Sequence, residues 1–280
     1  MNLPSLILAN GGAIAVLMVT LWLVSLWRSD VSIVDIFWGL GFVVVAWLTC
    51  LAGSGEAARQ WLLVGLTTVW GLRLASYLAW RNHGKPEDYR YRAMRDAYGP
   101  RFRWISLFLV FGLQGVILWI VSLPLQAGQL SDAGWRWLDA AGILFWTVGF
   151  AFETVGDVQL ARFKADPANR GHVMDRGLWR YTRHPNYFGD FLVWWGLYLI
   201  AASGGAWWTV FSPVLMSVLL LRVSGVALLE RSLKARTAGY ETYVRRTSAF
   251  FPWPPKQELG DESGSSASAE NRVDKGVECR

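Results

Sequence analysis

The sequence of 280 residues is too hydrophobic and too poor in charge for an ordinary soluble protein. Hydrophobic residues make up 53% of it, with 18 tryptophans among them, and charged residues only 17%, against about 25% in a typical soluble chain. This composition predicts an all-α protein that crosses a membrane several times.

Seven apolar stretches approach the roughly 20 residues needed to cross a bilayer. They cover residues 5–27, 31–52, 59–80, 104–123, 137–161, 187–204 and 206–229. The last two are separated by little more than Ser203-Gly204-Gly205, which favours a tight hairpin. We therefore predict seven transmembrane helices in one domain, residues 1–256, and a disordered tail over the polar residues 257–280.

The positions of Lys and Arg predict the orientation, because cytoplasmic loops hold the positive excess. Residues 81–103, 162–183 and 230–256 contain 19 of the 27, whereas the loops 53–59 and 124–136 contain one each. The N-terminus is then outside and the C-terminus in the cytoplasm, as expected for a bacterial inner-membrane protein. This bias explains the net charge of +6, and we expect no nucleic-acid partner.

Residues 81–103 form a basic, tyrosine-rich loop on the cytoplasmic side. Turn signals occur at Gly84-Lys85-Pro86 and at Gly99-Pro100. We interpret the segment as an interfacial loop that holds anionic membrane lipid. The alternative is a lid over a cytoplasmic pocket.

Ionisable residues inside the predicted spans are functional candidates, because burying charge in a membrane is costly. They are Asp35, Arg73, Glu153, Asp157, Asp190, Arg222 and Glu230. With spans that alternate in direction, these groups converge on the cytoplasmic side. Two pairs, Asp35 with Arg73 and Asp190 with Arg222, have an alternative role as interhelical ion pairs.

The most polar motif, GLWRYTRHPNYFGD at residues 177–190, lies at the cytoplasmic start of the sixth span. Pro185 suits the first turn of a helix, whose free N–H groups and partial positive charge attract phosphate. Further cationic donors precede it, namely Arg176, Arg180, Arg183 and His184. Asn186 and Asp190 are four residues apart, so they share a helix face suited to ribose hydroxyls or a carboxamide.

Three ligand classes fit this motif: a dinucleotide, a lipid headgroup and a sulfonium nucleoside. The chain has neither the dinucleotide-binding G-x-G-x-x-G after a strand nor the phosphate-binding G-x-x-x-x-G-K. A nucleotide would therefore bind inside the helix bundle. Cys50 in a predicted span and Cys279 in the tail give no disulfide or metal-ligand spacing.

Several segments resemble the steroid 5-alpha-reductase C-terminal domain family. They are Gly156-Asp157-Val158-Gln159, the motif at 177–190, Tyr240-Glu241-Thr242-Tyr243 and Thr247-Ser248-Ala249-Phe250-Phe251-Pro252-Trp253. The pairs Val34-Asp35, Trp38-Gly39 and Gly41-Phe42 resemble its bacterial branch, so the match covers residues 30–253. The resemblance implies a seven-helix membrane enzyme that uses NADPH to reduce the C4–C5 double bond of a 3-oxo-delta-4 steroid.

The resemblance also implies which residues hold the cofactor. The family's Asn and acid fall on Asn186 and Asp190, where other members have Glu in place of the Asp. The acid before the cofactor loop falls on Asp157, a basic loop residue on Lys164, and an Arg of relatives on His172. The other cofactor-site candidates are Glu153, Arg176, Tyr181, Arg183, His184, Arg222 and Glu230.

In relatives a Glu and a Tyr lie near the steroid ketone. Asp35 is the nearest acid and Tyr77 the nearest Tyr, with Trp70 as the alternative for the Tyr position, and Arg73 completes the catalytic candidates. Hydride attack on an enone builds negative charge on the ketone oxygen, which a donor in a dry site stabilises. We expect a monomer that takes a steroid or other enone from the lipid and NADPH from the cytoplasm.

Two other classes of function remain open. The R-H-P-x-Y-x-G signal also resembles membrane methyltransferases that modify isoprenylcysteine or phospholipids with S-adenosylmethionine. Those enzymes end the cofactor site with paired acids or Arg-Glu, whereas this chain has Glu230-Arg231 in reversed order. A seven-span transporter or receptor is the third class, but its polar site should lie at the midplane.

Overall fold

The computed structural model describes residues 1–223 and 239–256. Within these ranges every regular element is helical, and the one β-bridge joins Thr182 to Ser248. The predicted tail, residues 257–280, lies outside them. The all-α prediction is therefore confirmed for the part of the chain that the structure describes.

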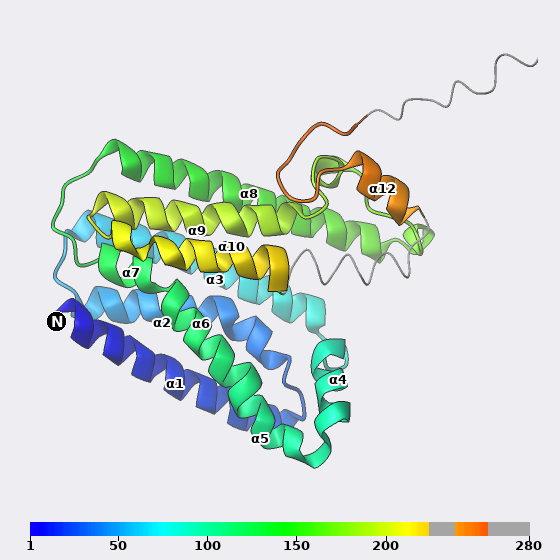
Figure 1. The fold of residues 1–280 in the computed structure, drawn as a ribbon, viewed down its shortest axis with the longest axis horizontal. Helices are drawn as coiled ribbons and strands as arrows, with labels where there is room; N and C mark the ends of the chain where they lie inside the picture. The colour runs from blue at the N-terminus through cyan, green and yellow to red at the C-terminus, as the bar shows by residue number, and fades with distance from the viewer. Residues whose placement is uncertain (224–238, 257–280) are drawn as a thin grey trace, which may run out of the picture.

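The long helices run side by side along the length of the molecule (Figure 1). The first three are α1 (Leu3–Arg28), α2 (Ile33–Ala52) and α3 (Ala57–Asn82). A broken helical segment follows, made of α4 (Tyr89–Tyr98), η1 (Gly99–Arg101), α5 (Phe102–Ser106), the π-helix η2 (Leu107–Gly112), α6 (Leu113–Val121) and α7 (Leu123–Gly128). After it come α8 (Trp137–Ala165), η3 (Pro167–Asn169), η4 (Gly177–Arg180), α9 (Pro185–Ser203), η5 (Trp207–Val210), α10 (Phe211–Val218), the π-helix η6 (Leu219–Val223) and α12 (Tyr240–Arg246).

Five helical stretches of the described chain are long and apolar enough to cross a membrane. They are residues 3–28, 33–52, 57–82, 89–128 and 137–165, which agrees with a polytopic membrane protein. α9 has 19 residues, and it carries Asn186 and Asp190, so it does not join the five. The described part of the seventh predicted span is the shorter apolar stretch Trp207–Arg222, and the count of seven stays a prediction.

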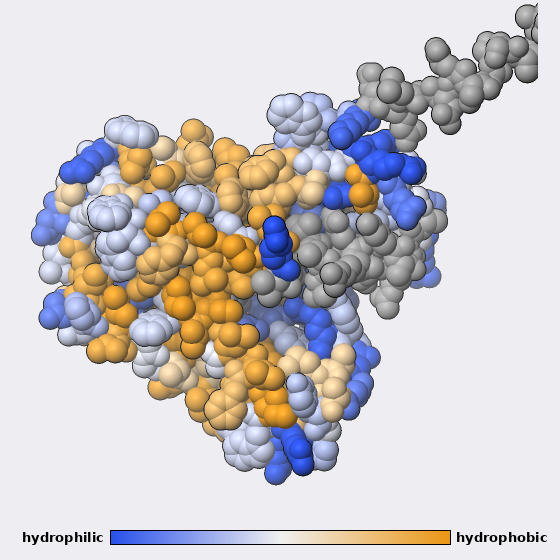
Figure 2. Space-filling view, viewed as in Figure 1, coloured by the Kyte–Doolittle hydropathy of each residue, from blue (hydrophilic) through white to orange (hydrophobic). Residues whose placement is uncertain are grey.

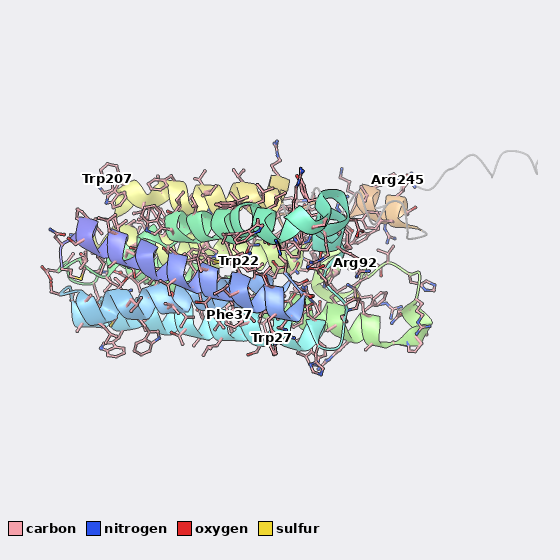
Figure 3. The ribbon with its side chains drawn as sticks, turned by 90° about the horizontal axis from the view of Figure 1, so that it is seen from below. Trp22, Trp27, Phe37, Arg92, Trp207 and Arg245 are labelled. Carbon is pink, nitrogen blue, oxygen red and sulfur yellow. The ribbon has the colours of Figure 1, made fainter. Side chains whose placement is uncertain are left out.

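The surface is divided into an apolar middle and polar ends. In Figure 2 hydrophobic residues form a band across the centre of the visible face, and hydrophilic residues gather at the two ends. Figure 3 places Trp207 at one end and both Arg92 and Arg245 at the other. This second end contains the loops in which the sequence concentrates positive charge, and the candidate site lies there.

Glycines set the close contact between α8 and α9. A Cβ atom on Gly149 would lie 2.5 Å from the carbonyl oxygen of Gly189, and one on Gly196 would lie 2.6 Å from that of Gly142. Small residues let membrane helices approach in this way. Because the backbones touch, the polar residues at the start of α9 are held against the acids at the end of α8.

Candidate functional site

A cluster of buried charges joins α3 to α8. The guanidinium of Arg73 donates to Glu153 Oε1 and to Asp157 Oδ2, both at 2.7 Å. The indole N–H of Trp70, one turn before Arg73, donates to the other oxygen of Glu153 at 2.9 Å. Charge-assisted hydrogen bonds of this kind are short and strong, so the acids of α8 are fixed in place.

The start of α9 adds an amide and a third acid to this cluster. The helix begins at Pro185, which confirms the start predicted from the motif. Asn186 Nδ2 donates to Asp157 Oδ1 at 3.2 Å. Asp190 faces the charges of Arg73 and Asp157, and the indole N–H of the buried Trp194 lies close enough to interact with its carboxyl group. Three carboxyl groups thus share one arginine.

A cleft of about 1000 Å³ opens beside this cluster, between the ends of α3 and α8. Asp157 and Asn186 line its inner part, together with Tyr77 of α3 and Lys164 of α8. The Tyr77 ring lies under two cations, 5.8 Å from Arg73 and 5.8 Å from Arg81. The cleft therefore gives a ligand a path to Asn186 and to the buried Asp157.

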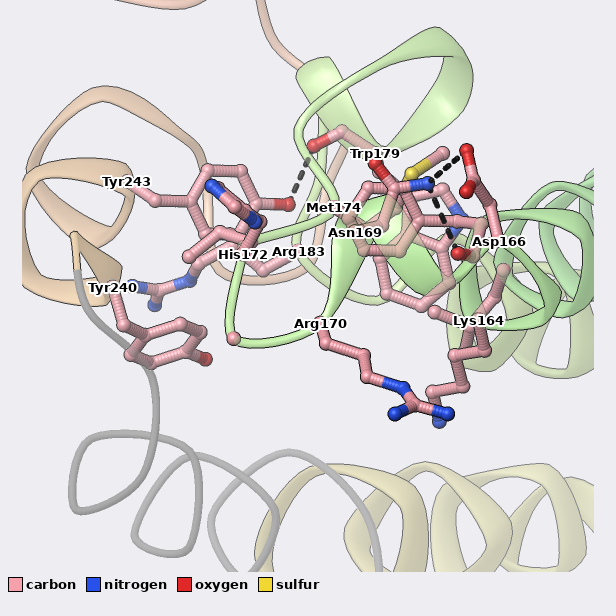
Figure 4. A pocket seen from close by; sticks show the side chains of 14 residues that line it. Lys164, Asp166, Asn169, Arg170, His172, Met174, Trp179, Arg183, Tyr240 and Tyr243 are labelled. Atoms are coloured by element: carbon pink, nitrogen blue, oxygen red, sulfur yellow. Dashed lines mark hydrogen bonds between the residues drawn. The ribbon is translucent and has the colours of Figure 1, made fainter.

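A second cavity, of about 320 Å³, lies beside the end of α8 and the loop that follows it, and it is rich in cations and aromatic rings. Lys164, Arg170, His172 and Arg183 supply the basic groups (Figure 4). Tyr240 and Tyr243 of α12 line the side opposite Lys164 and Arg170. Leu160 and Lys164 line both cavities, so the two adjoin at the end of α8.

The second cavity has a rigid wall. Tyr243 donates its hydroxyl to the carbonyl of Trp179 at 2.5 Å, and the Trp179 indole donates to the carbonyl of Gly156 at 3.1 Å. Asn169 donates to the carbonyl of Phe163 at 3.1 Å. These bonds tie α12 and the loop after α8 to α8 itself, so the cavity has a defined shape.

The structure places Asp35 in a different cluster from Arg73 and Tyr77. Asp35 Oδ1 accepts a hydrogen bond from the hydroxyl of Tyr91 at 2.7 Å, and Oδ2 one from Arg90 at 2.8 Å. Gln114 Nε2 donates to the same hydroxyl at 3.2 Å. The predicted alternative pair of Asp35 with Arg73 is therefore replaced by contacts with α4.

Further bonds hold α4 against the start of α2. Glu87 Oε1 accepts from the Val31 N–H at 2.9 Å and from Arg95 at 2.8 Å, and the hydroxyl of Ser32 accepts from the Asp88 N–H at 2.7 Å. Burial raises the pKa of Glu87, but the bonds from Arg95 and Val31 lower it more, so the net pKa lies below its usual value. The carboxylate is charged at neutral pH and keeps α4 in place.

Tyr187 lies between the two clusters. It is within electrostatic reach of Arg81 and Arg90 and also of Asp157 and Asp190. Its ring stacks on that of the buried His184, with centroids 5.7 Å apart. The clusters therefore belong to one region at the polar end of the bundle.

The remaining candidates are dispersed. Arg176 and Tyr181 are exposed next to the second cavity. Arg222 is exposed on η6, so the pair of Asp190 with Arg222 is not formed, and Arg73 is the cation that faces Asp190. Glu230 lies outside the described residues.

Sequence reasoning did not single out three residues of this region: Tyr91, Gln114 and Arg170. Tyr91 lies in the basic loop 81–103, where its place in a tyrosine-rich segment suggested an interface with lipid instead. Only the alternative interpretation of that loop, as a lid over a cytoplasmic pocket, would have placed Tyr91 near a site. Arg170 carries no local pattern that separates it from other loop residues.

Comparison with known proteins assigns the chain to a family. The family described as "Protein of unknown function (DUF1295)" matches residues 21–247. The chain belongs to the DUF1295 family. An uncharacterized protein of Schizosaccharomyces pombe, C594.04c, is 25% identical over 268 residues, which cover 83% of this chain and 75% of that protein. No solved structure matches.

Proposed function

We propose that this DUF1295 protein is a membrane reductase that uses NADPH to reduce the C4–C5 double bond of a 3-oxo-delta-4 steroid or a similar lipophilic enone. The observation that carries the proposal is the pair of adjoining cavities, one basic and one ending at Asp157 and Asn186, with Lys164 in both. The motif at 177–190 and the relation of DUF1295 to the steroid 5-alpha-reductase superfamily support it.

The chemistry of the residues fits the parts of a phosphorylated dinucleotide. Lys164, Arg170 and Arg183 suit phosphate oxygens, and the rings of Tyr240 and Tyr243 offer faces on which a base can stack. At the inner end of the cleft, Asn186 and the acids around Arg73 suit hydroxyl and carboxamide groups. Asp190, on the same face of α9 as Asn186, is a further acceptor for a carboxamide N–H.

When bound, the nicotinamide supplies the hydride, and the protein supplies position and electrostatics. Negative charge then develops on the substrate carbonyl oxygen. We assign its stabilisation to the hydroxyl of Tyr91, which Asp35 and Gln114 hold in place. Turning its O–H from Asp35 to the carbonyl would give a donor in a buried site, and Tyr77 in the cleft is the alternative donor.

In this proposal the chain spans the membrane with its cofactor site on the cytoplasmic side. The substrate enters from the lipid, and the cofactor enters through the cleft beside α3 and α8. The buried α3 residue Trp70 and the start of α9 separate the aqueous cleft from the core of the bundle.

A methyltransferase that uses S-adenosylmethionine is the second candidate, because one observation favours it. Three carboxyl groups lie around one arginine, an acidic surrounding that suits a positively charged sulfonium. Methyl transfer from S-adenosylmethionine would leave the basic cavity without a role, since this cofactor has no phosphate. The basic cavity is the reason for preferring the reductase.

Cofactor binding by the purified protein in detergent separates these candidates. We expect NADPH to bind with a change in its fluorescence and to raise the melting temperature, and S-adenosylmethionine to do neither. Lys164→Gln should weaken NADPH binding about tenfold, since it removes a charged hydrogen-bond donor. Lys256→Gln is the matched control, because Lys256 lines neither cavity. Stabilisation by S-adenosylmethionine alone would reject the reductase.

A further inference from the structure

A third cavity, of about 310 Å³, lies at the same polar end of the bundle, between the end of α1 and the segment that contains α4 and α5. Its polar lining consists of Ser25, Ser29, Arg95, Arg103 and Ser106. None of its lining residues is shared with the two cavities of the proposed cofactor site. It is therefore a separate place where a ligand can bind.

Two exposed tryptophans are next in sequence to residues that line this cavity. Trp27 at the end of α1 is 85% exposed, and Trp104 in α5 is 55% exposed. Exposed tryptophans near the ends of membrane helices lie at the level of the lipid headgroups. Leu26, which lines the cavity, is also exposed. The cavity thus opens where a phospholipid would present its headgroup.

One arginine of the cavity carries charge that no described residue neutralises. Arg95 is bound by Glu87 and by the carbonyl of Ser29. Arg103 has no ion pair, and its guanidinium makes no hydrogen bond within the described ranges; it lies over the Trp104 ring at 5.9 Å. A guanidinium offers five N–H donors in a geometry that suits phosphate oxygens.

The serines complete the polar lining with acceptors. Ser25 donates its hydroxyl proton to the carbonyl of Trp22 at 2.7 Å, and Ser106 donates to the carbonyl of Arg103 at 3.0 Å. Their oxygen lone pairs are then left to accept hydrogen bonds. A ligand that combines phosphate with hydroxyl groups therefore matches the cavity better than phosphate alone.

We propose that this cavity binds the headgroup of an anionic phospholipid of the phosphatidylglycerol type. The phosphate contacts Arg103, and the glycerol hydroxyls donate to Ser25 and Ser106. A cationic choline or ethanolamine group is disfavoured, because Arg103, which has no ion pair in the described chain, lines the cavity. The site is independent of the reductase proposal, and it gives part of the basic loop 81–103 a defined ligand.

The test is the melting temperature of the purified, delipidated protein in detergent, titrated with phosphatidylglycerol, phosphatidylcholine or inorganic phosphate. We expect stabilisation by phosphatidylglycerol and little by the other two. Equal stabilisation by phosphatidylcholine would show that the cavity does not distinguish an anionic headgroup from a zwitterionic one. Equal stabilisation by inorganic phosphate would replace the lipid with a free anion. Either result overturns the proposal without use of a variant.

Variants then locate the site. Arg103→Gln should weaken binding of phosphatidylglycerol about fivefold, the effect of one basic residue near an anionic membrane, and Arg103→Lys should retain part of the affinity. Arg101→Gln is the control, because Arg101 is exposed two residues away and does not line the cavity. An equal loss in Arg101→Gln would mean diffuse attraction to the basic loop and would reject the cavity.

Discussion

Two arginines that pair with buried acids occupy opposite ends of the bundle, and their surroundings differ. At the end away from the cleft, Arg59 pairs with Asp139 at 3.2 Å, and the two side chains are 2% and 1% exposed. Ser203 donates to Asp139 at 2.6 Å, and Arg59 donates to the carbonyls of Ala133 and Gly134. One positive charge meets one negative charge, and both are hydrogen-bonded.

At the other end, Arg73 faces three acids. Two of them, Glu153 and Asp157, bind it directly, and the third, Asp190, forms no ion pair with it in the described chain. A large cleft reaches Asp157. Burial of charge is common to both clusters, so burial alone does not mark a site. Unmatched charge next to a cavity does, because a ligand can supply the missing partners.

Removing one partner of the Arg59–Asp139 pair should give the largest loss of stability. Asp139→Ala leaves the charge of Arg59 buried and unpaired, which costs about 3–5 kcal/mol of stability. The measurement is thermal or denaturant unfolding in detergent. NADPH affinity of the protein that remains folded should not change, because the Arg59 cluster lines neither cavity of the cofactor site.

The double variant Arg59→Met with Asp139→Leu is the control for this prediction. Replacing a buried ion pair by apolar residues of similar size is often close to neutral. It should therefore recover most of the stability lost in Asp139→Ala. If the double variant loses NADPH binding while it stays folded, the Arg59 cluster is not purely structural and the comparison fails.

The cluster of Asp35, Arg90 and Tyr91 is intermediate between the Arg59 and Arg73 clusters. Its groups are paired, as in the first, but its proposed role is catalytic. Tyr91→Phe removes only the hydroxyl, so turnover of a 3-oxo-delta-4 steroid with NADPH should fall about 100-fold, the usual contribution of a positioned proton donor. NADPH affinity should stay the same. Tyr77→Phe is the matched variant: if it loses turnover and Tyr91→Phe does not, the donor is Tyr77.

Local patterns made part of the site predictable. Proline at the first turn places the start of α9 at Pro185, and spacing of four puts Asn186 and Asp190 on one face. The bias of Lys and Arg indicated which end of the helices would carry the polar groups. The glycines at 142, 149 and 156 and those at 189 and 196 recur every seven residues, and such a spacing of small residues is itself typical of two helices in close contact.

Long-range pairing was not predictable. Asp35 could meet any cation on the same side of the membrane, and its partners come from α4, 55 and 56 residues later in the chain. Arg73 and Arg90 fit Asp35 equally well on charge alone. Only the docking of α4 through Glu87 and Ser32 decides between them. Helix periodicity carries no information about such contacts.

The smallest effect on stability is expected for Asp190→Asn. This variant is also the most direct test of the comparison between the two ends. The amide replaces one of the three carboxyl groups around Arg73, so stability should stay the same or rise by up to about 1 kcal/mol, as at other sites where function has a stability cost. NADPH affinity should fall about tenfold, because a charged hydrogen-bond acceptor is lost.

Asp157→Asn is the matched variant for Asp190→Asn, since Asp157 binds Arg73 directly at 2.7 Å. It should lower both stability and NADPH affinity, whereas Asp190→Asn separates the two. Melting temperature with and without NADPH measures both quantities in one experiment. A loss of stability in Asp190→Asn with unchanged NADPH affinity would make Asp190 a structural residue like Asp139. Unmatched charge would then no longer distinguish the two ends of the bundle.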